Sequence, residues 1–174
     1  MQPYKYILLK PDYYSFSTDA GTEYHCYFYS IEEIFSDYPS LAKRAFAFNL
    51  VLKDNLSYQK GLDKRIAATV ADILKTFLHQ KENAVVYICD NSDNREKARF
   101  HKFYHWFKEY NDGSIIQLRG VVRAGNTNIL NAILIHKDNP QLNDFIEAFE
   151  IITGIFTKPD DDELQNILND DGEW

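Results

Sequence analysis

Two histidines near the middle of the chain have a spacing that suits metal binding. His101 and His105 lie four residues apart, so on a helix both imidazoles would point from one face and could ligate zinc. The pattern lacks the adjacent glutamate of a His-Glu-x-x-His motif, and the sequence offers no evident third ligand. On a helical wheel both histidines lie nearly opposite a phenylalanine stripe. This position favours a solvated helix face over a metal site.

A second metal-like pattern stands where an apolar run ends. Asp90, Ser92 and Asn94 alternate, and oxygen ligands at alternating positions suit a hard cation. A calcium loop also requires glycine at its sixth position and glutamate at its twelfth, where this chain has Arg95 and His101. We therefore interpret the segment as a turn that caps the next helix, and we predict no metal site.

Residue types that support catalysis are present without the arrangement that catalysis needs. Cys26 and Cys89 both lie in apolar, strand-like runs, where a free thiol usually behaves as a small hydrophobe. A Gly-x-Ser-x-Gly elbow, a phosphate loop and a dinucleotide fingerprint are all missing from the sequence. We predict no catalytic residue and no cofactor, and the interpretation leans away from an enzyme.

A binding surface is the stronger prediction. On a wheel of 3.6 residues per turn, Arg95, Arg99, Lys102 and Trp106 share one narrow stripe beside the phenylalanine face. Arg119 and Arg123 share a face of the next strand and extend the stripe if that face is turned toward the helix. Such a surface suits phosphate, nucleic acid or an acidic peptide, with Trp106 available for stacking. The alternative is an ordinary amphipathic boundary, in which long cationic stems cover the edge of the core.

The charge of the chain is unevenly distributed. The net charge is −7, yet residues 157–174 hold seven acids and one lysine and so carry −6 of it. We predict one globular domain over residues 1–156 and an acidic tail over 157–174 that occupies or gates the cationic stripe. Because neither a secretory signal nor a membrane-length apolar run is present, we expect a cytoplasmic protein without a membrane partner.

Periodic apolar residues predict the elements that position this surface. Asp63 is the expected N-cap of one helix. Asp93 is the expected N-cap of the next helix, where it pairs with Glu96 in a capping box. Asn111-Asp112-Gly113 is expected to end that second helix. The predicted order is strand, strand, strand, helix, strand, helix, strand, strand, helix. It indicates an α/β or α+β fold with a mixed, mostly antiparallel sheet, an N-terminal meander and about three core helices. The predicted segments are residues 14–18, 24–28, 45–53, 66–77, 84–89, 100–107, 114–122, 127–135 and 142–152.

The segment YICDNSDNREKAR and the HWF that follows resemble an uncharacterised family of small proteins from the bacterial phylum Bacteroidota, a domain of unknown function. The resemblance extends through YSFSTDAGTEY and DKRIAATVADIL and covers most of residues 4–150. It implies an intracellular bacterial setting and brings no activity with it.

The element order also resembles the N-acetyltransferase superfold, which implies acetyl-coenzyme A as a cofactor. In that superfold a glycine-rich loop at a helix N-terminus binds the pyrophosphate. The matching loop here runs from Tyr58 to Asp63 and keeps Gly61, but it ends in an aspartate that would repel phosphate. Asn94 and Ala98 depart from the spacing of the second signature, and Tyr104 lies six residues after Ala98.

Together these observations predict a non-catalytic binding or regulatory module for a protein or polyanionic partner. The alternative is an acyl-CoA-dependent N-acetyltransferase with a divergent cofactor loop.

Overall fold

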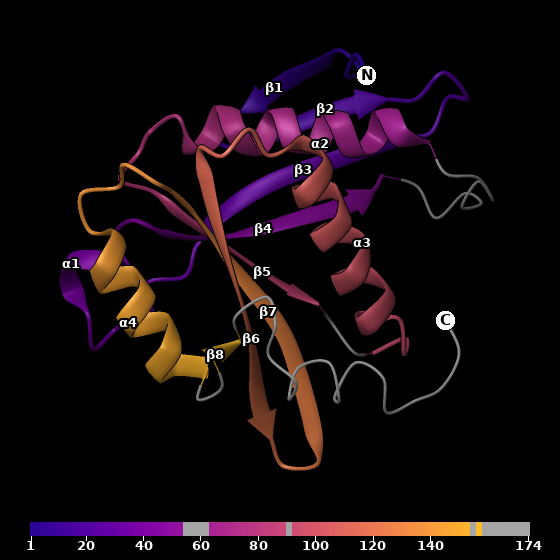
Figure 1. The fold of residues 1–174 in the computed structure, drawn as a ribbon. Helices are drawn as coiled ribbons and strands as arrows, with labels where there is room; N and C mark the ends of the chain where they lie inside the picture. Colours follow the sequence, from indigo (N-terminus) through magenta and orange to yellow (C-terminus); the bar gives the residue numbers. More distant parts are fainter. Residues whose placement is uncertain (54–62, 90–91, 154–155, 158–174) are drawn as a thin grey trace.

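The computed structural model describes residues 1–53, 63–89, 92–153 and 156–157 of the chain (Figure 1). The helices are α1 (Pro39–Ala42), α2 (Lys64–Leu78), α3 (Glu96–Tyr110) and α4 (Leu142–Thr153). The strands are β1 (Tyr6–Lys10), β2 (Tyr13–Ser17), β3 (Glu23–Ser30), β4 (Ala45–Leu52), β5 (Ala84–Cys89), β6 (Ile115–Ala124), β7 (Thr127–His136) and β8 (Phe156–Thr157).

Within the described residues, all eight strands belong to one sheet, in the order β1-β2-β3-β4-β5-β7-β6-β8. Strands β1 to β4 form an antiparallel meander at the N-terminus, and of the strand pairs in the described ranges only β4 and β5 are parallel. The structure therefore confirms the predicted mixed, mostly antiparallel sheet with an N-terminal meander. No helix in the described ranges is both long and apolar enough to cross a membrane.

The helices cover both faces of the sheet. Helices α2 and α3 pack on one face, and α1 and α4 pack on the other (Figure 1). Val70 and Ile73 of α2 join one core with Phe100 of α3, whereas Leu41 of α1 joins a second core with Phe145 of α4. The apolar stripes that predicted three core helices are thus the faces that the sheet buries.

Strand β5 is covered on both faces, as its almost continuous apolar sequence predicts. Ala84 and Val86 belong to the core beneath α1 and α4, while Val85, Tyr87 and Cys89 belong to the core beneath α2 and α3. Alternate residues of a strand point to opposite faces, so a strand buried on both sides needs apolar residues at nearly every position.

Three short elements were not predicted. The edge strand β1 has the sequence YILLK, whose consecutive apolar residues show no alternation, and β8 spans only two residues. Residues 30–40 were interpreted as a short helical turn or a loop that ends near Pro39, and instead Pro39 begins α1. Proline fits the first turn of a helix because its missing N–H would have no intrahelical partner there.

Helix α4 lies unusually close to the sheet at one glycine. A Cβ atom placed on Gly120 of β6 would lie 2.8 Å from Cγ2 of Thr153 and 3.1 Å from Cε1 of Phe149. Only a residue without a side chain permits this approach between strand and helix.

A polar network lies on the face of the meander opposite α2. Glu23 Oε1 accepts from His25 Nε2 at 2.9 Å and from Ser15 Oγ at 3.0 Å, and Glu23 Oε2 accepts from Lys53 Nζ at 3.0 Å. With Nε2 donating, Nδ1 of His25 accepts from the Tyr13 hydroxyl at 2.8 Å. The hydrogen bond from His25, followed by that from Lys53, lowers the pKa of Glu23 from 4.5 to about 2.

This network predicts acid-sensitive stability. Because the folded-state pKa of Glu23 lies below its unfolded value, its contribution is complete above about pH 4.5 and is lost as the pH falls toward 2. We expect Glu23→Gln to lower the urea midpoint of unfolding at neutral pH, and the difference from wild type to close in that acid range. The control is Glu33→Gln, at an exposed glutamate between β3 and α1, and a constant wild-type difference for Glu23→Gln at every pH would contradict the assignment.

Candidate polyanion-binding surface

Helix α3 begins later than its capping signal predicts. Its N-cap residue is Arg95, which makes no side-chain capping bond, so the predicted capping box of Asp93 and Glu96 is wrong. The backbone of Asn94 has a φ of 56°, and Asp93 Oδ1 instead accepts from the Arg95 amide at 3.1 Å. A left-handed residue between Asp93 and the helix thus turns the aspartate from a helix cap into a local turn residue.

One flank of α3 carries the four residues predicted from the helical wheel. Arg95 and Lys102 are exposed, and Arg99 and Trp106 are half-buried. Lys102 Nζ lies 4.9 Å from the centre of the Trp106 ring. We call Arg95, Arg99, Lys102 and Trp106 the tryptophan flank.

Asp93 neutralises part of the charge on the tryptophan flank. The Arg99 guanidinium donates to both carboxylate oxygens of Asp93 at 2.8 Å. This hydrogen bonding lowers the pKa of Asp93 to about 2, so the carboxylate stays charged at neutral pH. The pair of Asp93 and Arg99 is therefore close to neutral.

Arg119 does not extend the tryptophan flank. It lies under the opposite side of α3, where its guanidinium stacks 4.2 Å from the ring of Tyr104. Lys108 Nζ approaches the same ring at 5.4 Å, and the side chain of Arg119 is buried, at 5% exposure. Arg123 lies on the same strand face nearer the hairpin turn and is exposed. We call Tyr104, Lys108, Arg119 and Arg123 the tyrosine flank.

The two histidines of α3 lie beside the tyrosine flank. His105 is exposed, and its ring centre lies 6.0 Å from that of Tyr104. His101 is half-buried, so the expectation that both face solvent is wrong for this residue. Burial lowers the pKa of His101, and electrostatic interaction with His105 and Arg119 lowers it further. These shifts place His101 in the same positive environment as Arg119.

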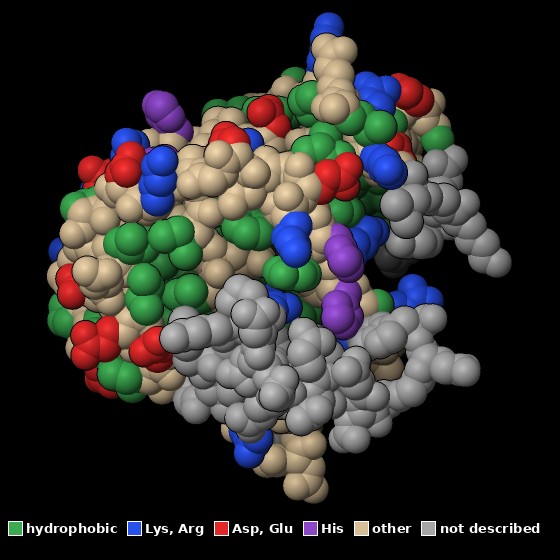
Figure 2. Space-filling model, in the orientation of Figure 1, with side chains coloured by type: hydrophobic (Ala, Val, Ile, Leu, Met, Phe, Trp, Pro, Cys, Tyr) green, Lys and Arg blue, Asp and Glu red, His purple; other side chains and the backbone are tan. Residues whose placement is uncertain are grey.

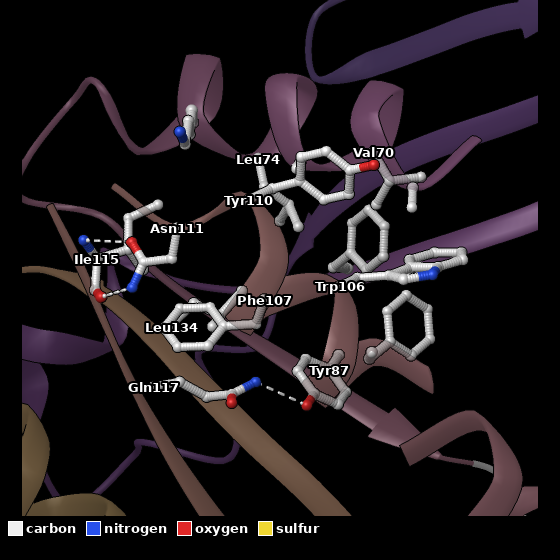
Figure 3. Close-up of a pocket in the computed structure, with 15 residues that line it drawn as sticks. Val70, Leu74, Tyr87, Trp106, Phe107, Tyr110, Asn111, Ile115, Gln117 and Leu134 are labelled. Carbon is white, nitrogen blue, oxygen red and sulfur yellow. Dashed lines mark hydrogen bonds between the residues drawn. The ribbon is translucent and has the colours of Figure 1, made fainter. Parts of the chain in front are cut away.

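A small apolar cavity lies beneath α3, with a volume of about 50 Å³ (Figure 3). Val70 and Leu74 of α2 face Trp106 and Tyr110 of α3 across it. Toward the sheet, Gln117 Nε2 donates to the Tyr87 hydroxyl at 2.9 Å, and burial raises the pKa of Tyr87 well above its usual value. Helix periodicity identified the apolar residues on each helix, but nothing local indicated that the two helices and the sheet leave a space between them.

Several positive side chains lie close together on the face of the molecule that carries α3 (Figure 2). Figure 2 shows Lys, Arg and His side chains together over α3. The exposed cations there come from α3 and from the β6–β7 hairpin, two segments that only the fold brings together. Both flanks place a cation beside an aromatic ring, an arrangement suited to binding extended anionic ligands with planar groups.

The residues of the acetyltransferase alternative are placed differently. Asp63 caps α2 by accepting from the Arg65 amide at 2.9 Å, and it also accepts from the Tyr4 hydroxyl at 2.6 Å. Its carboxylate therefore takes the position at the helix N-terminus that a pyrophosphate would need. Gly61 lies outside the described residues, as does Asp90 of the metal-like pattern.

Within the described residues, the thiols and the acidic groups offer no arrangement typical of a catalytic or metal site. Cys26 and Cys89 are buried, and burial raises the pKa of Cys26 strongly and that of Cys89 to about 12. Among the residues that the structure describes, no group of three or more His, Cys, Asp or Glu residues could hold a metal ion.

The fold and this surface define a mixed α/β protein with a cation-bearing helix over the middle of its sheet. Residues 62–151, just over half of the chain, match a family of unknown function (DUF6169), and the chain belongs to that family. The match runs from α2 into α4, so it includes α3 and Arg119 and leaves the N-terminal hairpin outside. No curated protein matches the chain. The predicted membership of a family of unknown function is thus confirmed.

Proposed function

We propose that the protein is a non-catalytic binding module that holds a polyanionic segment of a partner macromolecule along α3. The observation that carries the proposal is the pair of flanks: cations lie beside Trp106 on one side of the helix and beside Tyr104 on the other. Cations on both sides of α3 attract anionic groups. An anionic ligand that lies along the helix can therefore interact with both flanks.

The acidic tail is proposed to compete with that partner. Strand β8 pairs with β6 so that Thr157 lies opposite Arg119 of the tyrosine flank. The chain that follows carries seven acids and one lysine, and its 17 residues can extend about 55 Å. A tethered segment that starts beside the surface has a high effective concentration there, so a partner must displace it.

Binding of a fluorescent single-stranded oligonucleotide to the full-length protein tests this proposal by anisotropy. We expect a variant with Asp160, Asp161 and Asp162 changed to Asn to bind roughly three- to tenfold more tightly than wild type. The matched control changes the exposed Glu32, Glu33 and Asp37 near α1 to their amides, which raises the net charge by the same amount. Equal gains in affinity in both variants would contradict gating by the tail. If the wild type does not bind the oligonucleotide at low salt, nucleic acid is rejected as the ligand. An acidic protein segment is then the expected ligand, and labelled polyglutamate is the probe for it.

A second candidate function, an acyl-CoA-dependent N-acetyltransferase, is supported by one observation. Strands β4 and β5 pair in parallel over three residues only, Ala45–Ala47 with Ala84–Val86, and then follow different neighbours to Leu52 and Cys89. The element order resembles that of the superfold, and this divergence separates the C-terminal ends of β4 and β5. The Asp63 cap argues against it. An increase in melting temperature with acetyl-coenzyme A would favour the enzyme over the module.

The cellular setting is also a proposal. Two buried free cysteines suit a reducing compartment, and the resemblance to a bacterial family agrees with it, so we propose a cytoplasmic bacterial protein.

A further inference from the structure

Strand β1 is an edge strand with an open apolar surface. It stands at the end of the sheet order and, in the part of the chain that the structure describes, pairs only with β2. Ile7, Leu8 and Leu9 follow one another and are 61%, 59% and 51% exposed. Ile7 and Leu8 point to opposite faces of the sheet, and both stay exposed although the neighbouring Tyr6 reaches α2 and donates to Asp72 at 2.8 Å. An exposed apolar edge is a ready template for pairing with another strand.

The ends of this edge are protected, although its centre is not. Lys5 and Lys10 flank the apolar residues, and Pro3 and Pro11 lie just beyond them. Lysine and proline discourage strand addition, because proline cannot donate a ladder hydrogen bond and a lysine opposes burial. The register with β2 also shifts between Leu8 and Lys10. Any strand that pairs with β1 is therefore confined to about five residues centred on Leu8.

We propose that β1 pairs in antiparallel fashion with β1 of a second copy of this chain, with Leu8 on the two-fold axis. A two-fold pair brings the same patch of both subunits together, so the patch must be complementary to itself. In this register Leu8 lies opposite Leu8 of the second copy, and Ile7 of each copy faces the irregular segment around Leu9 of the other. The two Lys10 residues lie beyond these apolar residues, roughly 13 Å apart along the strand.

Neighbouring registers are less favourable. Centring the pair on Ile7 would place Lys5 opposite Leu9, and centring it on Leu9 would place Lys10 opposite Leu8. Only the Leu8-centred register matches apolar residues at the middle with polar ends. This self-complementarity is why a second copy, and not an unrelated strand, is the expected occupant.

The size of the paired edge determines the expected affinity. A stable specific interface buries about 1,600 Å² in total, more than one short strand pair provides. We therefore expect a dimer that dissociates at roughly micromolar concentrations.

Cysteine cross-linking tests the register in the full-length protein. In either kind of antiparallel pair, opposed Cα atoms lie about 4.5–5.5 Å apart, which is within disulfide range. Leu8→Cys should therefore form a covalent dimer under a mild glutathione couple, and the native thiols should not compete because Cys26 and Cys89 are 0% and 3% exposed. The matched control is Lys5→Cys, whose two copies would be about 20 Å apart. Equal cross-linking of both variants, or of neither, would overturn the proposed pairing.

Sedimentation equilibrium provides a second test without a covalent bond. We expect the average mass of the wild type to rise with concentration and that of Leu8→Lys to remain monomeric, with an unchanged melting temperature. Ile151→Lys is the control, because Ile151 is 63% exposed on α4, away from β1. Loss of association in both lysine variants, or a wild type that stays monomeric up to about 1 mM, would contradict the β1 dimer and leave the edge to a strand from a different protein.

Discussion

Replacing Phe100 by alanine is expected to lower the free energy of unfolding by about 3–5 kcal/mol. Phe100 is fully buried, and its ring centre lies 6.2 Å from that of Tyr87 on β5. It is the residue of α3 that lies deepest in the core. Truncation removes its buried apolar surface and leaves a cavity next to the space already present beneath α3.

Urea unfolding followed by far-ultraviolet circular dichroism measures this loss. For a chain of this size, it corresponds to a decrease of roughly 10 °C in melting temperature. Ile151→Ala is the control, since that side chain is 63% exposed on α4, and its effect should stay within about 0.5 kcal/mol. A loss below about 1 kcal/mol for Phe100→Ala would contradict the tight packing of α3 on the sheet.

The second large effect concerns the tryptophan flank. We expect the variant with Arg95, Arg99 and Lys102 changed to Ala to bind a single-stranded oligonucleotide about ten- to a hundredfold more weakly at low salt. Asp93 already pairs with Arg99, so about two phosphate contacts should disappear. The slope of log affinity against log salt concentration should then decrease by roughly 1.4, since each contact on a single strand contributes about 0.7.

A charge-matched control separates a site from a general effect of net charge. Lys43, Lys81 and Lys137 are exposed and lie outside both flanks of α3. Their triple alanine variant has the same net charge as the test variant and should retain most of the affinity. Equal losses in the two variants would show that the oligonucleotide follows net charge alone, and the tryptophan flank would then lose its role. Circular dichroism of both variants confirms that α3 remains folded.

The sequence by itself determined the local elements and the faces they bury. The spacing of Ile66, Val70, Ile73 and Phe77 predicted α2 and its buried stripe, because residues three and four apart share one side of a helix. Asp63 caps that helix as predicted, and Gly113 takes a left-handed conformation, with a φ of 87°, after α3 ends. The tryptophan flank was found for the same reason, because Arg99, Lys102 and Trp106 lie on α3 and Arg95 is its N-cap residue.

Only the tertiary structure decided where strand residues meet the helices. Arg119 and Arg123 were expected to extend the tryptophan flank if their strand face turned toward the helix. Arg119 does face α3, yet it lies under Tyr104, because β7 and not β6 is the neighbour of β5. Gly120 shows the same limit. A side chain at this position would clash with α4, which lies about 30 residues further along the chain. Periodicity reports which residues share a face, but strand order follows from pairings between distant segments, which no local pattern encodes. The tyrosine flank, the cavity beneath α3 and the open edge of β1 all depend on that order.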